Sequence, residues 1–174
     1  MERLVKVHNR EIENLYAKIF KCDKIKQMKR SKYVLLIVLS IILLDQVTKY
    51  LVISYLNPFD SIEVFPFLHL VSVRNTGAAF GMFKGLGNIS FITISVFAII
   101  FVLWFLIRDM YNYFGLSLVL GGAAGNLIDR LLYGQVVDFI DFSIGRFHWP
   151  AFNVADSSLT IGIIIIFSQA LLKK

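Results

Sequence analysis

The sequence predicts a polytopic membrane protein with four transmembrane helices, and three observations lead to this prediction. Of the 174 residues, 57% are hydrophobic and only 17% are charged, and the mean hydropathy is +0.69. A soluble domain of this length would need more polar surface to cover its core. Four segments are about as long as the roughly 20 mostly apolar residues that cross a bilayer as a helix. Lysine and arginine also gather at one side of these segments.

The four expected spans are Tyr33–Ile53, Ile89–Ile107, Tyr111–Ile128 and Val154–Leu172. The third is the least hydrophobic, because it contains several glycine and alanine residues between positions 115 and 125. Small side chains allow neighbouring helices to approach closely in a membrane. We therefore expect the third span to lie at the centre of the bundle.

The placement of lysine and arginine predicts the orientation of the chain. Ten of them precede the first span, Arg108 lies between the second and third, and Lys173 and Lys174 end the chain. The loops on the other side, 54–88 and 129–153, together carry only four. Cytoplasmic segments near a membrane are enriched in these residues. Both termini are therefore expected in the cytoplasm and both long loops outside it.

The chain divides into a basic cytoplasmic extension, residues 1–32, and a transmembrane domain, residues 33–174. The extension is compatible with a helix that lies on anionic lipid headgroups. The interpretation that we favour is a solvated segment that fixes the orientation of the chain. Its charged stretch is too long for a cleavable signal peptide.

The first outer loop contains a predicted strand at residues 68–74, where residues with high β-propensity follow two proline-containing turns. A small sheet at the membrane surface could pair its edge with an extended peptide. The expected fold is therefore an all-α polytopic membrane protein with a small extracytoplasmic β-sheet.

Polar side chains collect at the outer ends of the spans and in the outer loops. They are Asp45, Lys49, Asn75, Asn126, Asp129, Arg130, Asp138, Asn153 and Asp156. Charge near bilayer depth is costly, so such groups usually mark a functional site. One cysteine, and three histidines far apart in the sequence, make a disulfide or a metal site unexpected. No cofactor is expected either.

Five blocks of the sequence carry a resemblance to a known family. They are Asp45–Lys49, Asn75–Gly81, Gly121–Arg130, Val137–Phe139 and Phe152–Ser157. In this order and spacing the sequence resembles the lipoprotein signal peptidase family, also called signal peptidase II. The resemblance extends from about residue 33 to the C-terminus and leaves the basic extension outside it.

The resemblance implies an aspartic endopeptidase that removes the signal peptide of diacylglyceryl-modified bacterial prolipoproteins. Cleavage would occur just before the lipidated cysteine, near the extracytoplasmic face of the inner membrane. The catalytic pair of the family corresponds to Asp138 and Asp156. The other site residues correspond to Asp45, Lys49, Asn75, Gly77, Asn126, Asp129, Arg130, Asn153 and Ala155. Besides its prolipoprotein substrates and membrane lipids we expect no nucleic-acid partner, and we expect a monomer.

Physical chemistry supports the same pair independently of the family. Two neighbouring carboxyl groups cannot both ionise easily, so they share a proton and can act as base and acid on one water. If Asn153 caps the fourth span, Asp156 is its third helical residue, where the helix dipole favours a negative charge. We therefore expect Asp156 to be the more acidic partner and Asp138 to be the more readily protonated one. Asp141 should point to the opposite face of a strand, toward solvent.

Other roles are open for the surrounding residues. We favour structural charge pairs for Asp45 with Lys49 and for Asp129 with Arg130, although both pairs could instead orient the catalytic groups or the substrate. Asp156 could be a helix-capping acid alone, and Asn75 and Asn126 could bind a peptide or connect helices. The Gly77–Gly81 segment is expected to form a tight turn with an apolar tip. His148 and Trp149 are expected to lie at the membrane interface.

Three other functions compete with the peptidase. A proton-coupled transporter would place its acids near the middle of helices and would show an inverted repeat, and neither is present in the sequence. A scaffold subunit would use its acids only to hold helices together. A serine–lysine peptidase would need Lys49 to be unpaired, and Asp45 lies one helical turn away.

Overall fold

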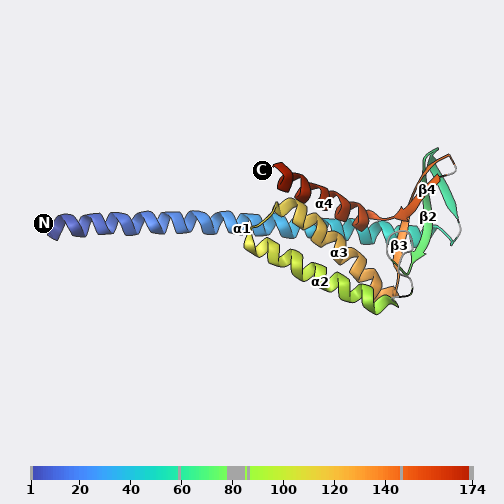
Figure 1. Ribbon diagram of the computed structural model, residues 1–174, viewed down its shortest axis with the longest axis horizontal. Helices are drawn as coiled ribbons and strands as arrows, with labels where there is room; N and C mark the ends of the chain where they lie inside the picture. Colours follow the sequence, from blue (N-terminus) through green and yellow to red (C-terminus); the bar gives the residue numbers. More distant parts are fainter. Residues whose placement is uncertain (1, 59, 78–84, 86, 146, 173–174) are drawn as a thin grey trace. The chain divides into compact units, whose positions relative to one another are not determined.

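The computed structural model describes residues 2–58, 60–77, 85, 87–145 and 147–172, with side chains from residue 24 onward. The chain forms two compact units, residues 1–35 and 36–174. The elements follow in the order α1 (Glu2–Tyr55), β1 (Ser61–Phe65), β2 (Leu68–Asn75), α2 (Gly87–Arg108), α3 (Tyr113–Tyr133), β3 (Val136–Ile144), β4 (Phe147–Phe152) and α4 (Val154–Leu172). Within the second unit the helices lie side by side, and the sheet lies beyond one end of them (Figure 1).

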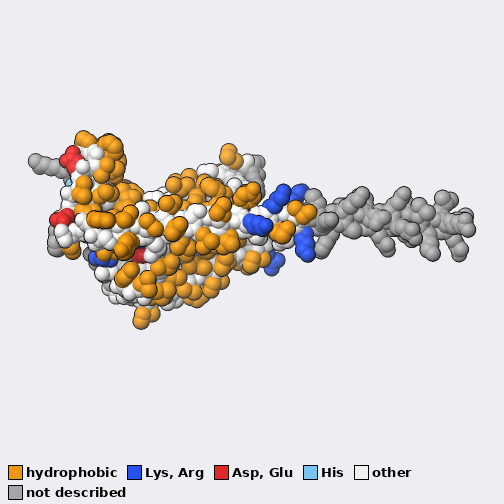
Figure 2. Space-filling view, turned by 180° about the vertical axis from the view of Figure 1, so that it is seen from behind, with side chains coloured by type: hydrophobic (Ala, Val, Ile, Leu, Met, Phe, Trp, Pro, Cys, Tyr) orange, Lys and Arg blue, Asp and Glu red, His pale blue; other side chains and the backbone are white. Residues whose placement is uncertain are grey.

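Three helices of the described chain are long and apolar enough to cross a membrane: Lys24–Tyr55 of α1, Gly87–Arg108 and Val154–Leu172. Large apolar side chains stay exposed on them, which suits contact with lipid (Figure 2). The helix α3 is not among the three. It begins at Tyr113, two residues later than expected, because the Asn112 side chain accepts hydrogen bonds from the N–H groups of Phe114 and Gly115 and caps the helix.

Close packing around α3 confirms its predicted central position. A Cβ atom at Gly121 would lie 2.9 Å from the Cβ of Ile41 in α1. A Cβ atom at Gly122 would meet the carbonyl oxygen of Ala155 in α4. On the other side, Leu116 and Leu120 of α3 form a buried cluster with Val102 of α2. The helix therefore contacts all three other helices, and small residues allow two of these contacts.

The four strands form one antiparallel sheet in the order β1-β2-β3-β4. The predicted strand in the first outer loop is confirmed as β2, but the description of the fold as all-α is wrong, because β3 and β4 form a second hairpin. Register shifts place extra residues in β2 and β4 and none in β3. The side chains of β3 therefore alternate regularly, and Asp138 and Asp141 point to opposite faces as expected.

A buried cluster fastens the sheet to the helices. Val52, in the last turn of α1, and Leu56, just after the helix, pack against Phe139 of β3. Leu70 of β2 and Val154 of α4 border the same cluster. Because these side chains come from two strands and two helices, the cluster fixes the position of β3 relative to the first turn of α4.

We expect Gly122→Ala to lower the thermal stability of the purified protein. The new methyl group would meet the Ala155 carbonyl and the Ser158 hydroxyl and would separate α3 from α4. Overpacking of this kind costs about 1–3 kcal/mol, more than alanine gains from its helix propensity. The midpoint of thermal unfolding in detergent measures the effect. Gly85→Ala is the control, because a Cβ there would meet none of the described residues within 4 Å; equal midpoints for both variants would contradict the prediction.

Candidate active site

Asp138 lies near the start of β3 and is almost completely buried. Its Oδ2 accepts a hydrogen bond of 2.9 Å from the side-chain amide of Asn75, which ends the neighbouring strand β2. Its Oδ1 accepts one of 2.7 Å from the side-chain amide of Asn153. Two amides from different segments therefore fix the orientation of this carboxyl group.

Asp156 lies in the first turn of α4, where Asn153 caps the helix as predicted. The N–H of Asp156 donates to Asn153 Oδ1 at 2.8 Å, and the N–H of Asn153 donates to Asp156 Oδ2 at 3.3 Å. This is a reciprocal capping box. The other oxygen, Oδ1, accepts a hydrogen bond of 2.8 Å from the side-chain amide of Asn126 in α3. Asp156 thus caps its helix and also keeps an oxygen in contact with α3.

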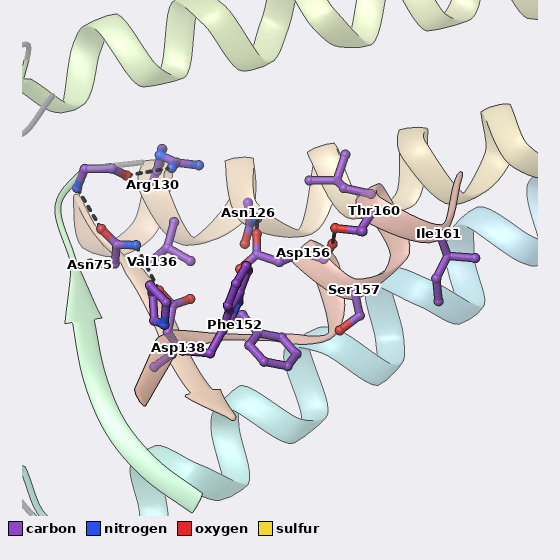
Figure 3. Close-up of a pocket in the computed structure, with 15 residues that line it drawn as sticks. Asn75, Asn126, Arg130, Val136, Asp138, Phe152, Asp156, Ser157, Thr160 and Ile161 are labelled. Carbon is purple, nitrogen blue, oxygen red and sulfur yellow. Dashed lines mark hydrogen bonds between the residues drawn. The ribbon is translucent and has the colours of Figure 1, made fainter. Parts of the chain in front are cut away.

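Both aspartates line one cavity of about 500 Å³ (Figure 3). Asn153 contacts both of them, through its side chain to Asp138 and through its backbone and side chain to Asp156. The rest of the polar lining comes from the following residues: Asn75, Gly77, Asn126, Arg130, Ser157 and Thr160. The remaining wall is mainly apolar and comes from β3, β4 and α4: Val136, Trp149, Pro150, Ala151, Phe152, Leu159 and Ile161. The cavity therefore joins two acids to a hydrophobic surface.

The surroundings of Asp138 bring its pKa close to neutral pH. Burial raises the pKa of Asp138 to about 7, and the nearby charge of Asp156 acts in the same direction. Hydrogen bonds from Asn75 and Asn153, together with the charge of Lys49, oppose this rise in pKa. At neutral pH this carboxyl group is therefore able either to hold a proton or to release it.

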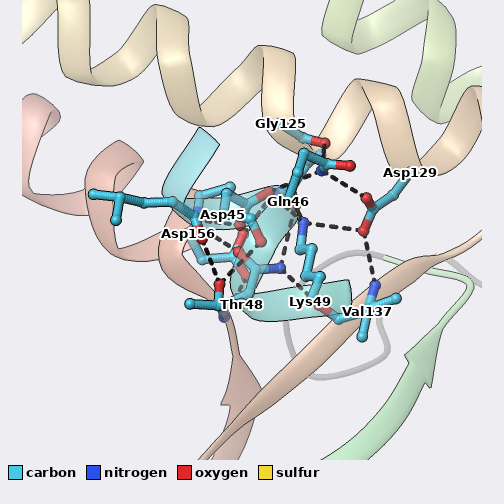
Figure 4. Close-up of polar contacts among 12 residues, drawn as sticks. Asp45, Gln46, Thr48, Lys49, Gly125, Asp129, Val137 and Asp156 are labelled. Carbon is cyan, nitrogen blue, oxygen red and sulfur yellow. Dashed lines mark hydrogen bonds and ion pairs between the residues drawn. The ribbon is translucent and has the colours of Figure 1, made fainter. Parts of the chain in front are cut away.

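Behind the cavity, three charged side chains form a buried cluster (Figure 4). The ammonium group of Lys49 lies 2.7 Å from Asp45 Oδ2 and 3.0 Å from Asp129 Oδ2. It also donates 3.1 Å to the side-chain oxygen of Asn126. All three charged side chains are at most 3% exposed. The expected pairing of Asp45 with Lys49 is confirmed, and the cluster connects α1 to α3.

The expected pairing of Asp129 with Arg130 is wrong. Adjacent residues of a helix point about 100° apart, so only one of them can face the buried cluster. Asp129 faces Lys49. The Arg130 side chain instead donates a hydrogen bond of 3.3 Å to the carbonyl oxygen of Gly77. Its guanidinium group also lies over the ring of Phe91, 5.2 Å from the ring centroid. The guanidinium group therefore belongs to the lining of the cavity.

The two acids of the cluster each hold a backbone N–H next to a cavity aspartate. Asp45 Oδ1 accepts 2.9 Å from the N–H of Ala155, the residue before Asp156. Asp129 Oδ2 accepts 3.1 Å from the N–H of Val137, the residue before Asp138. The ammonium of Lys49 lies between these two acids. One cation thus sets the relative position of the backbone segments that carry both aspartates.

Gln46 is a member of this cluster that we did not expect from the sequence. Its amide donates to Asp129 Oδ1 at 2.9 Å, to the carbonyl oxygen of Gly125 at 3.2 Å and to Asp45 Oδ2 at 3.2 Å. The one signal in the sequence is its place between Asp45 and Lys49 in an apolar span. A polar side chain at bilayer depth needs a partner, and this rule applies to amides as it does to acids.

The opposite face of β3 carries a separate polar group. The Asp141 carboxylate accepts a hydrogen bond of 2.9 Å from the ring of His148, and its side chain is 16% exposed. Asp141 is therefore paired rather than simply solvated. The rings of His69 and His148, far apart in the sequence, have centroids 6.4 Å apart on the sheet.

In the expected Gly77–Gly81 turn, residues 78–81 lie outside the described residues. Gly77 itself is buried, and its N–H donates 2.9 Å to Asn75 Oδ1.

Comparisons with known proteins identify the family of this chain. The sequence model of "Signal peptidase (SPase) II" matches residues 37–172. The chain belongs to the signal peptidase II family. It is 50% identical over 133 residues to the lipoprotein signal peptidase of Thermodesulfovibrio yellowstonii, covering 76% of this chain and 90% of that protein. It is 44% identical over 153 residues to that of Staphylococcus haemolyticus, covering 84% and 96%.

A solved structure described as "Bacterial membrane enzyme structure by the in meso method at 2.3 A resolution" has a similar fold. Its TM-score is 0.75 at 44% identity, covering 82% of this chain and 88% of that one. The predicted membership of the signal peptidase II family, a family of peptidases, is therefore confirmed. All five motif blocks lie inside the matched range, and residues 1–36 lie outside it.

We expect Lys49→Met to destabilise the protein strongly, because it leaves Asp45 and Asp129 buried without their cation. Removal of one partner from a buried ion pair typically costs about 3–5 kcal/mol. Adding Asp129→Asn should recover part of the loss, since one unpaired carboxylate disappears while an oxygen for Val137 remains. Unfolding midpoints of the single and double variants test this, with exposed Lys26→Met as the control. A double variant no more stable than Lys49→Met would contradict the prediction.

Proposed function

We propose that this protein is an aspartic endopeptidase that removes the signal peptide from diacylglyceryl-modified bacterial prolipoproteins. The names of its relatives support the class of substrate. One observation carries the chemistry: two aspartates from separate segments line one cavity, and Asn153 contacts both of them. Cleavage just before the lipidated cysteine is part of the proposal, on the strength of the family resemblance.

In the proposed mechanism one proton is shared by the two carboxyl groups. Asp138 holds it, as its raised pKa favours. Asp156 is the carboxylate, because the first turn of α4 and the Asn126 amide stabilise a negative charge there. A water between them loses a proton to Asp156, and its oxygen attacks the carbonyl carbon of the scissile bond. Asp138 at the same time gives its proton to the carbonyl oxygen.

The tetrahedral intermediate then breaks down by the reverse transfers. Asp156 gives its proton to the amide nitrogen as the C–N bond breaks, and Asp138 takes a proton back from one of the two hydroxyl groups. The products are a carboxylic acid and an amine, and the pair again holds one proton. The neutral amides of Asn75, Asn126 and Asn153 keep both carboxyls oriented throughout without cancelling their charge.

The lining of the cavity suits a substrate that is part peptide and part lipid. Asn75 and Arg130 offer polar groups for the peptide backbone, and the apolar wall formed by Trp149, Phe152 and Ile161 can take hydrophobic parts of the substrate. We propose that Gly77, beside Arg130, contributes to the same subsite. Asp45, Lys49, Asp129 and Ala155 act behind the cavity by positioning the two aspartates.

We further propose that all four helices of the transmembrane domain, residues 33–174, cross the inner membrane. The interior position of α3 explains how a helix of low hydropathy can do so, since its neighbours replace lipid as its surroundings. Lysine and arginine then place both termini in the cytoplasm and the cavity near the extracytoplasmic face. The catalytic unit of the proposal is a monomer, because residues of one chain line the cavity.

We expect Asp138→Asn and Asp156→Asn each to lower the rate of cleavage of a synthetic diacylated prolipoprotein by roughly 10²–10⁴-fold, the usual contribution of a general acid or base. Each variant should keep its unfolding midpoint and still bind the substrate. Asp141→Asn is the matched control, because Asp141 lies on the same strand and faces the other way. It should cleave at the wild-type rate.

Cleavage at the wild-type rate by both Asp138→Asn and Asp156→Asn would end the peptidase proposal. Loss of assembly or folding without a specific loss of turnover would favour a scaffold role instead.

The pH dependence gives an independent check on the shared proton. Since Asp138 must hold a proton, kcat/KM should fall as the pH rises through about 7. The hydrogen bond from Asn75 lowers the pKa of Asp138. Asn75→Ala should therefore raise this pKa and move the alkaline limb to higher pH, whatever it does to the maximal rate. A limb that stays in place or moves to lower pH would contradict the assignment of the proton, and Asp141→Asn should leave the limb unchanged.

A further inference from the structure

The stretch of α1 just before the apolar span carries five cations and no acid. They are Lys24, Lys26, Lys29, Arg30 and Lys32, and the acids that flank them along the chain are Asp23 and Asp45. The four lysines are exposed and Arg30 is half-buried. Figure 2 shows the blue side chains gathered along this part of the helix. We call residues 24–32 the basic collar.

Helical geometry distributes these cations around the whole circumference. At about 100° per residue, Lys26, Lys29, Arg30 and Lys32 lie near 200°, 140°, 240° and 80° from Lys24. The widest gap between neighbouring cations is therefore about 120°. A helix that lies flat on a membrane needs one broad apolar face, and this stretch has none. A ring of charge instead suits a helix that passes through a layer of headgroups.

The distance to the apolar span places the collar partly within the headgroup layer and partly just beyond it. With a rise of about 1.5 Å per residue, Lys29, Arg30 and Lys32 lie within about 6 Å of Tyr33, where the apolar stretch begins, and Lys24 lies about 14 Å away. The headgroup layer is roughly 5–8 Å thick on each side of the hydrocarbon. The field of a charged surface extends about 8 Å further at physiological ionic strength. All five cations are therefore within reach of lipid phosphates.

We propose that the basic collar binds acidic phospholipid headgroups of the leaflet in which this end of α1 leaves the membrane. Juxtamembrane lysines and arginines each increase attraction to anionic lipid by about five-fold. The collar lies outside residues 37–172, which match the peptidase family, so it adds a lipid contact to a peptidase domain that other residues form. It selects the lipid that surrounds the first span.

Cys22, the only cysteine, gives a labelling position beside the collar. The full chain, with a donor fluorophore on Cys22, is reconstituted in phosphatidylcholine vesicles. These vesicles contain a trace of acceptor-labelled phosphatidylglycerol or, in a parallel sample, of phosphatidylcholine labelled on the same acyl chain. We expect phosphatidylglycerol to be enriched about five-fold or more around the donor, and the enrichment to fall as salt is added.

The chain offers a control matched in charge. Ten lysines and arginines precede the first span, five in the collar and five before it: Arg3, Lys6, Arg10, Lys18 and Lys21. Glutamine at the five collar positions should abolish the preference for phosphatidylglycerol. Glutamine at the five earlier positions should preserve most of it, and arginine at the four collar lysines should preserve it fully. Unfolding midpoints verify that each variant is folded.

Several results would overturn the proposal. One is equal enrichment of the two lipids around the wild-type chain, which requires no variant and therefore decides the matter even if a variant fails to fold. Another is an equal loss of preference in both glutamine variants, which would indicate net charge rather than the collar. The third is collar-dependent binding of a single-stranded oligonucleotide without any preference for phosphatidylglycerol. None of these readouts depends on the peptidase chemistry.

Discussion

The ammonium group of Lys49 is the interaction on which the rest of the site depends. It lies between Asp45 and Asp129, and these two acids hold the N–H groups of Ala155 and Val137. The charge of Lys49 thereby fixes four elements relative to one another: α1, α3, β3 and the start of α4. Burying three ionised groups is costly, and an apolar replacement of similar volume would often be equally stable. The benefit of the cluster is therefore its geometry: it determines where the two cavity aspartates lie.

The cluster also explains why amides, and not cations, bind the cavity aspartates. A lysine or arginine in direct contact with Asp138 would stabilise its ionised form and lower its pKa. Asn75 and Asn153 orient this carboxyl group but leave its pKa raised to about 7. Lys49 is connected to Asp156 by hydrogen bonds through Asn126, which accepts from the ammonium and donates to the carboxylate. The two amides thus orient Asp138 and lower its pKa less than burial and Asp156 raise it.

Local signals predicted much of this structure, and contacts between distant segments account for what was missed. Asn153 could be identified as a cap, and β2 as a strand, because both depend on residues a few positions apart. The partner of Asp129 could not, because Lys49 lies 80 residues earlier and comes near it only when α1 packs on α3. The nearer Arg130 was the natural choice in the sequence and was wrong. Gln46 was missed because a neutral amide in an apolar span attracts less notice than a charge.

The weak hydropathy of α3 follows from the demands of the site. This helix supplies Asn126, Asp129 and Arg130, and it must also approach its neighbours closely. At Gly125 a Cβ atom would lie 2.7 Å from Asp45 Oδ2 and 3.3 Å from the Cβ of Ala155. Any larger side chain there would push the buried cluster away from the turn that carries Asp156. The middle of α3 holds its glycines and polar residues and is buried by the other three helices, whereas its ends carry exposed large apolar side chains. The low hydropathy of α3 therefore reflects its interior position and the polar groups that it supplies.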